Sequence, residues 1–145
     1  MTPAERAVSL FQEGFNCSQS VLAAWCSRFG LDEETALKMA AGLGGGIGRT
    51  GGICGALTGA ILVLGLRYGT ADPKDKNTKH DLYRKTQTLM EQFKANAGSL
   101  YCRQLLGFDL STPEGLAASK RPGAFEECPQ FVRLAAELLE NFLEK

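Results

Sequence analysis

A glycine-rich run followed at once by an apolar run decides the fold: GLGGGIGRTGG at residues 42–52 and ICGALTGAILVLGL at residues 53–66. Seven of the first eleven residues are glycine, and glycine costs about 1 kcal/mol per residue relative to alanine inside a helix. We therefore expect a loop with positive φ angles that brings backbone close to a neighbour. As a helix, the apolar run would span about 20 Å at roughly 1.5 Å per residue, whereas a bilayer core needs about 30 Å. This predicts a buried helix and no membrane insertion.

Amphipathic helices are predicted on both sides of this run. The first begins with a capping box formed by Thr2 and Glu5, and Gly30 is a natural helix end. The expected helices cover residues 2–14, 17–29, 32–41, 54–66, a long segment after Pro73 that reaches Ala97, residues 100–107 and a last segment from Cys128 onward. Residues 108–127 are expected to be irregular. The chain is thus predicted to be all-α, a compact single domain over residues 1–145 with about five to seven helices and a Gly-rich loop.

Composition narrows the class of protein. Apolar residues make up 44% and charged residues 22%, and sixteen basic residues balance sixteen acidic ones. Nucleic-acid binding needs clustered Lys and Arg, so this balance argues against it. The N-terminal region has no pattern of a secretory signal peptide, which predicts a cytoplasmic protein. Five cysteines in a reducing compartment indicate metal binding or redox chemistry rather than permanent disulfides.

Four cysteines fall at the start of an expected helix: Cys17, Cys54, Cys102 and Cys128. Helix N-termini carry unpaired N–H groups and a partial positive charge, which stabilise an anion. A thiol there is expected to have a lowered pKa and to be the reactive or metal-binding form. Cys26 lies nine residues after Cys17 on the same helix, about 180° round its axis at roughly 100° per residue. We expect Cys26 to be a buried apolar residue outside any shared site.

The spacing of the four cysteines does not by itself establish a shared site. The intervals are 37, 48 and 26 residues, and the sequence has no CxxC. This is neither a zinc-finger nor a ferredoxin pattern. From spacing alone, four unrelated core cysteines are about as good an explanation as one site.

Five segments carry a resemblance to a known family. They are GFNCSQSV at residues 14–21, GGGIG at 44–48, CGALTGA at 54–60, CRQLLG at 102–107 and Cys128-Pro129. Together they resemble the C_GCAxxG_C_C family of putative redox-active proteins, in the family's order and over nearly the whole chain. One departure is that the family name reads Gly-Cys-Ala where this chain has Cys54-Gly55-Ala56. The resemblance implies that the signature cysteines are Cys17, Cys54, Cys102 and Cys128. Some members are related to a cysteine-rich region of split-Soret cytochromes, where an iron–sulfur centre is found.

Three accounts of the cysteines follow. The leading hypothesis is that all four thiolates bind an iron–sulfur cluster for electron transfer, since four is the usual ligand count. The second is a metal-free redox protein that cycles between dithiol and disulfide, with Cys54 as the preferred nucleophile. The third is a structural zinc site with four thiolates in a binding module without turnover. A redox partner protein is expected, and a homodimer is a further expectation; the sequence leaves open whether the chain is an enzyme.

The glycine-rich run is expected to serve the cysteine site. Its backbone N–H groups can bond to thiolate or sulfide sulfur, and the expected cofactor-binding glycines are Gly46, Gly48, Gly52 and Gly55. The GxGxxG at residues 46–51 follows a helix rather than a strand, which argues against a dinucleotide fold. Arg49 and Arg103 lie close to Cys54 and Cys102 in sequence, either as surface charges or as groups that favour thiolates. His80 is expected to be exposed.

Overall fold

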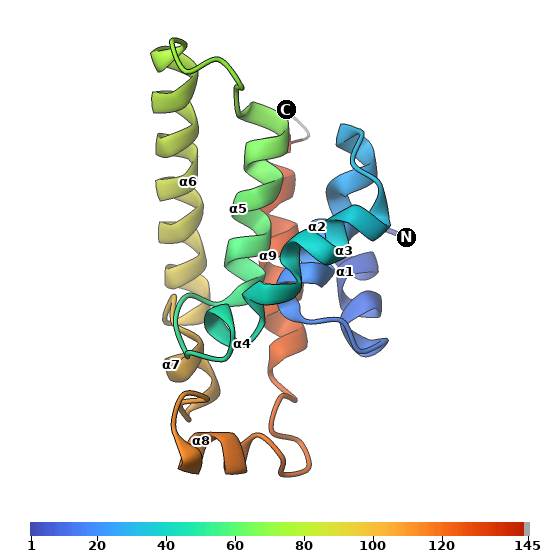
Figure 1. The fold of residues 1–145 in the computed structure, drawn as a ribbon, viewed down its shortest axis with the longest axis vertical. Coiled ribbons are helices and arrows are strands. Elements are labelled where there is room, and N and C mark those ends of the chain that lie inside the picture. Colours follow the sequence, from blue (N-terminus) through green and yellow to red (C-terminus); the bar gives the residue numbers. More distant parts are fainter. Residues whose placement is uncertain (144–145) are drawn as a thin grey trace.

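A computed structural model describes residues 1–143 and shows a bundle of α-helices (Figure 1). The elements are α1 (Pro3–Gln12), α2 (Cys17–Cys26), α3 (Glu33–Ala40), α4 (Gly44–Ile47), α5 (Gly55–Tyr68), α6 (Lys76–Ala97), α7 (Cys102–Leu106), α8 (Pro113–Ala118) and α9 (Cys128–Leu143). Short 3₁₀ turns follow α2 at Ser27–Phe29 and α3 at Ala41–Leu43. Within residues 1–143, the only β pairing is one isolated antiparallel bridge between Ile53 and Tyr101. The predicted all-α class is confirmed.

Helix α5 is the central element, as the apolar run predicts. It packs against α2, α6 and α9, and α5, α6 and α9 run side by side in Figure 1. None of the helices in the described part of the chain is both long and apolar enough to cross a membrane.

Local sequence signals set most of the helix ends. Thr2 and Glu5 form the predicted capping box of α1, and Asn16 forms a second one with Gln19 at the start of α2. Gly30 adopts the left-handed conformation after the 3₁₀ turn that follows α2. One expectation is wrong: residues 108–127 are not wholly irregular, because α8 forms there. Pro113 occupies its first turn and the Thr112 side chain caps it.

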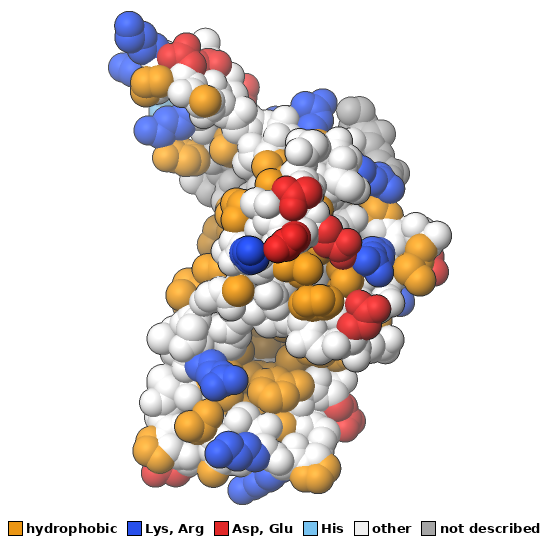
Figure 2. Space-filling model, turned by 45° about the vertical axis from the view of Figure 1, so that its right-hand side comes forward, with side chains coloured by type: hydrophobic (Ala, Val, Ile, Leu, Met, Phe, Trp, Pro, Cys, Tyr) orange, Lys and Arg blue, Asp and Glu red, His pale blue; other side chains and the backbone are white. Residues whose placement is uncertain are grey.

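The surface agrees with the balanced composition. On the face shown in Figure 2, Lys and Arg side chains are interspersed with Asp and Glu across the middle of the molecule. Ion pairs within residues 1–143 are exposed, as in Arg6–Glu33, Lys38–Glu34, Arg84–Asp81 and Arg133–Glu137. Pairs of this kind typically contribute only about 0–1 kcal/mol, so the fold rests on its apolar core.

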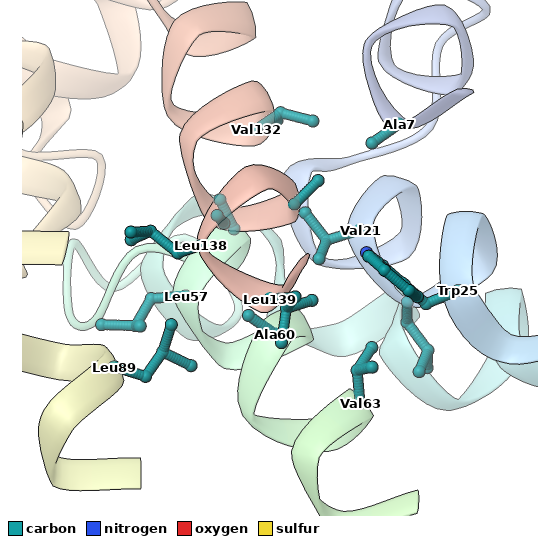
Figure 3. Close-up of a cluster of buried hydrophobic side chains, with 14 of the residues drawn as sticks. Ala7, Val21, Trp25, Leu57, Ala60, Val63, Leu89, Val132, Leu138 and Leu139 are labelled. Carbon is teal, nitrogen blue, oxygen red and sulfur yellow. The ribbon is translucent and has the colours of Figure 1, made fainter. Parts of the chain in front are cut away.

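That core lies where α2, α5 and α9 meet (Figure 3). Trp25 of α2 is fully buried, and Leu57 of α5 and Leu139 of α9 are buried with it. Burying a side chain of this size contributes about 1.5–3 kcal/mol relative to leaving it exposed. The core fixes the three helices relative to one another, and with them the position of each helix start.

Candidate functional site

Each of the four expected cysteines lies at a helix N-terminus. Cys17, Cys102 and Cys128 are the first residues of α2, α7 and α9, and Cys54 is the residue that precedes α5. The placement predicted from the sequence is confirmed. Helices α2 and α9 pack against α5, and α7 contacts α4, so these helix starts gather at one end of the bundle, where α4 and α7 lie in Figure 1.

A short backbone pairing joins Cys54 to Cys102. The Cys54 N–H donates to the Leu100 carbonyl (2.8 Å), and the Cys102 N–H donates to the Gly52 carbonyl (2.7 Å). The bridge between Ile53 and Tyr101 lies between these two hydrogen bonds. Two cysteines that are far apart in sequence are therefore held on adjacent strands of backbone. Sequence reasoning missed this pairing, because one bridge leaves no alternating pattern to read.

Two glycines make room around the cysteines. A Cβ atom at Gly55 would lie 3.2 Å from the Cβ of Cys17, and one at Gly46 would lie 2.7 Å from the Cβ of Cys102. The second contact is shorter than side chains tolerate, so any residue larger than glycine at position 46 would displace Cys102. These glycines bring the backbone up against the thiols.

The glycine-rich run forms a left-handed turn. Gly45, Gly46 and Gly48 have left-handed φ and ψ angles, and the two non-glycine residues among them, Ile47 and Arg49, also have positive φ (69° and 64°). Left-handed conformations cost about 1–2 kcal/mol for a residue with a Cβ atom. Hydrogen bonds close the turn, including those from the Gly51 N–H to the Gly45 carbonyl (3.1 Å) and from the Gly52 N–H to the Gly46 carbonyl (2.9 Å). The predicted positive φ angles are confirmed.

All four cysteines line one cavity with a volume of about 870 Å³. The other lining residues are mainly glycine and apolar side chains: Phe11, Gly14, Phe15, Asn16, Ala41, Gly42, Gly44, Gly45, Gly46, Gly48, Arg49, Gly55, Leu105, Leu106, Leu110, Leu116, Ser119, Lys120, Phe125 and Phe131. Three of the four glycines expected to serve the site line the cavity. The fourth, Gly52, is not a lining residue, but its carbonyl accepts the hydrogen bond from the Cys102 N–H. Cys26 is buried in the core, and its Sγ donates to the Ala23 carbonyl (3.4 Å).

Comparison with protein families identifies the chain. A family model described as "Putative redox-active protein (C_GCAxxG_C_C)" matches residues 15–142, which include all four cavity cysteines. The chain belongs to the C_GCAxxG_C_C family. Parallel searches of curated proteins and of solved structures gave no match.

In this C_GCAxxG_C_C protein, the five cysteines are free thiols with unequal acidities. The Cys17 and Cys128 thiols share a hydrogen bond, which raises the pKa of Cys17 and lowers that of Cys128. Burial raises the pKa of Cys54 to about 11, although the N–H groups of Ala56 and Leu57 act in the opposite direction. Burial, together with the neighbouring Cys54 and Cys128, raises the pKa of Cys102 to about 12.

These acidities correct one expectation. The sequence predicts a lowered pKa for all four thiols from their helix N-termini, but only Cys128 has one. Loss of water outweighs the helix-end N–H groups at the buried Cys54 and Cys102. Cys128, rather than Cys54, is the thiol that ionises most readily in the free protein.

The other residues considered from the sequence, Arg49, Arg103 and His80, lie in different surroundings. Arg49 lines the cavity, whereas Arg103 donates to the Gly51 carbonyl (3.1 Å) and its guanidinium lies 4.6 Å from the centre of the Tyr101 ring. His80 is exposed on α6, as expected. In residues 1–143, no three His, Cys, Asp or Glu side chains are grouped closely enough to hold a metal ion in this arrangement.

Sequence reasoning missed the outer wall of the cavity, which α8 and its flanking segments supply through Leu110, Leu116, Lys120 and Phe125. The available signal was the apolar residues that interrupt an otherwise polar, proline-containing stretch. The spacing of these apolar residues fits neither a helix nor a strand over a full window, so periodicity did not predict that they line a cavity.

Proposed function

We propose that this protein is an electron carrier in which Cys17, Cys54, Cys102 and Cys128 together hold an iron–sulfur cluster. One observation carries the proposal: four thiols from four different helix starts line a single, mostly apolar cavity. Four cysteine thiolates are the usual ligand set of such clusters. Unrelated core cysteines would have no reason to converge.

The residues around the cavity suit that group. The glycine wall includes Gly46 and Gly55, where the absence of a Cβ atom lets the backbone approach Cys102 and Cys17, and Gly48 lines the same cavity. Helix N-termini supply N–H groups that stabilise negative charge on sulfur. An iron–sulfur cluster supplies one-electron redox chemistry when bound. The apolar side chains would limit access of water, and hydrogen bonds to sulfur together with solvent exposure set the reduction potential.

The test is anaerobic purification followed by quantification of iron, acid-labile sulfide and zinc, with a visible spectrum of the same sample. We expect iron and sulfide in near-equal amounts. We also expect both to fall together in Cys54→Ser, because one ligand is lost. Cys26→Ala is the matched control, since Cys26 is a buried cysteine outside the cavity; it should keep iron and sulfide at the wild-type level.

Two results would contradict the cluster. Zinc alone in wild-type protein would indicate a structural four-thiolate site. Absence of metal, with reversible loss of free thiols, would indicate dithiol chemistry. Equal loss of iron from the Cys26→Ala and Cys54→Ser variants would show that iron content reports on folding rather than on ligation.

The hydrogen bond between Cys17 and Cys128 favours a second candidate function, dithiol–disulfide exchange. The Cys128 thiolate would attack a disulfide of a partner protein, and Cys17 would then displace the partner from the mixed disulfide. The products are a Cys17–Cys128 disulfide and two thiols on the partner, so two electrons and two protons are transferred. Mass spectrometry of the oxidised, metal-free protein should find this pair; a Cys54–Cys102 pair would exclude this assignment.

A further inference from the structure

The cavity is larger than a cluster requires. An eight-atom iron–sulfur core fills on the order of 250 Å³ if each atom takes about the 30 Å³ of a water molecule. The cavity of about 870 Å³ therefore has room left over, and its total volume lies in the range of small-molecule sites, about 300–1,000 Å³. The additional wall comes from α8 and the segments beside it, including Leu110, Leu116, Ser119 and Phe125.

The charged groups on the cavity wall are all positive. Among the described residues that line it, Arg49 and Lys120 carry charge, and the wall includes no Asp or Glu. Neither cation forms an ion pair with a carboxylate of residues 1–143. The pattern differs from that of the chain as a whole, where sixteen basic residues balance sixteen acidic ones.

Arg49 lines the cavity and is exposed, and its backbone conformation has a cost. It is a non-glycine residue with a φ angle of 64°, at the end of a turn where most positions are glycine. Strained backbone of this kind persists only where the surrounding structure imposes it, and it occurs preferentially at binding and active sites. The strained turn therefore presents a cation at the wall.

The rest of the outer wall is apolar and accessible. Leu116 and Phe125 are 39% and 40% exposed although they line the cavity. In Figure 2, hydrophobic side chains surround a hollow in the lower part of the molecule, with Lys and Arg side chains beside it. A ligand that fits this surface has an apolar body and a negatively charged end.

We infer that the outer part of the cavity binds a small organic anion with an apolar body, such as an aromatic or aliphatic carboxylic acid. Its charged end lies against Arg49 and Lys120, and its body lies between α8 and the cysteines. This deepens the proposed function by naming the class of small molecule that the site admits beside its redox group. It rests on the proposed function only in assigning that molecule to a redox site.

The test uses two fluorescent probes with the same apolar body. Anilinonaphthalene sulfonate carries a negative charge, whereas N-phenylnaphthylamine is neutral. Both are titrated into the anaerobically purified full chain, and the iron and sulfide contents of each preparation are recorded. We expect the anionic probe to bind at least about tenfold more tightly than the neutral probe, because one charge-assisted hydrogen bond in a partly apolar site increases affinity by about that factor. Added salt should reduce the difference.

Three variants locate the site. The Arg49→Gln/Lys120→Gln double variant should lose the preference for the anion while its affinity for the neutral probe stays within about twofold. Lys94→Gln removes one positive charge from the exposed face of α6 and should leave both affinities unchanged. Ser119→Trp fills the cavity from α8 and should weaken both probes about tenfold or more. Circular dichroism of each variant establishes that it is folded.

Equal affinity of the wild-type protein for the two probes would overturn the inference. So would an anion preference that survives in the double variant, or probe binding that Ser119→Trp leaves unchanged. A protein that contains iron and sulfide but does not distinguish the probes contradicts this inference alone. A protein that distinguishes them but holds no cluster contradicts the proposed iron–sulfur function and leaves the anion site intact.

Discussion

A hydrogen-bonding interaction shifts the pKa values of the Cys17 and Cys128 thiols in opposite directions, and it separates two residues that the sequence treats alike. Both begin a helix and both face the cavity. A thiolate at Cys128 gains a hydrogen bond, whereas a thiolate at Cys17 would lose one and would be buried beside other cysteines. In the metal-free site, Cys128 therefore ionises before Cys17.

We predict that Cys128 is the first cavity cysteine to be alkylated in the reduced, metal-free protein at neutral pH. Only the thiolate reacts, and Cys54 and Cys102, with pKa values of about 11 and 12, are almost fully protonated there. Cys17→Ala removes the donor, so the pH at which Cys128 becomes reactive should rise. Iodoacetamide labelling followed by mass spectrometry measures both effects. Faster labelling of Cys54 than of Cys128 would contradict the assignment.

The sequence locates the four cysteines but not their acidities. Placement at helix starts follows from local signals, such as the Asn16 and Gln19 capping box in front of Cys17. The pKa values depend on burial and on a neighbour more than a hundred residues away, as for Cys17 and Cys128. The sequence of a single helix does not predict burial or a contact with a distant residue, so it does not predict these pKa shifts.

At the scale of elements, the close approach of α2 and α5 determines where Cys17 and Cys54 lie relative to each other. Gly59 of α5 lies directly against the backbone of α2: a Cβ atom there would be 2.6 Å from the Ser18 carbonyl oxygen and 3.1 Å from its Cα. Gly65, one and a half turns further along α5, has nothing within 4 Å of such an atom. The two glycines of one helix therefore have opposite roles.

We predict that Gly59→Ala lowers the free energy of unfolding by about 1–3 kcal/mol, because two helix backbones must move apart. The matched variant Gly65→Ala should raise it by up to about 1 kcal/mol, since alanine is the better helix former. Urea unfolding of both variants provides the comparison. Similar shifts of the same sign would show that the α2–α5 contact tolerates a side chain.

Some elements of the fold follow from local sequence signals, and one does not. Helix α5 follows from its continuous apolar run, and the limits of α6 follow from Asp75, which caps its start, and Gly98, which is left-handed after its end. The left-handed turn at residues 45–49 follows from its glycines, as predicted. Helix α8 is missed although Thr112 and Pro113 mark its start, because a glycine within a short helix disfavours that assignment unless packing requires it. A Cβ atom at Gly115 of α8 would collide with the backbone of Asp109. The sequence shows this glycine but not the close approach of backbone that requires it.

At the scale of the whole molecule, we predict that the metal-free protein loses stability between about pH 9 and pH 11. The pKa of Cys54 is raised from 9.0 to about 11 in the folded state, so the unfolded chain releases this proton first as pH rises. Stability from Cys54 is complete below pH 9 and falls by about 1 kcal/mol at pH 10. Cys102, raised to about 12, acts in the same direction.

Urea unfolding at pH 8 and pH 10 measures this loss, and Cys54→Ala is the control. Other groups titrate in the same range, so the comparison is between the pH dependences of the two proteins. The variant should lose about 1 kcal/mol less stability over that interval than the wild type. Identical pH dependences would show that the Cys54 thiol is not held protonated by the fold.

The backbone pairing between residues 51–54 and 100–103 also has a consequence for how the protein is matured in the cell. The chain between those segments forms the α5–α6 hairpin, which must close before Cys54 and Cys102 meet. Cys128 joins them only when α9 has packed against α5 and α6. No nascent chain that lacks α9 can present four thiols to an assembly factor. A ligand that contacts all four thiols can therefore complete its set of contacts only once α9 is synthesised.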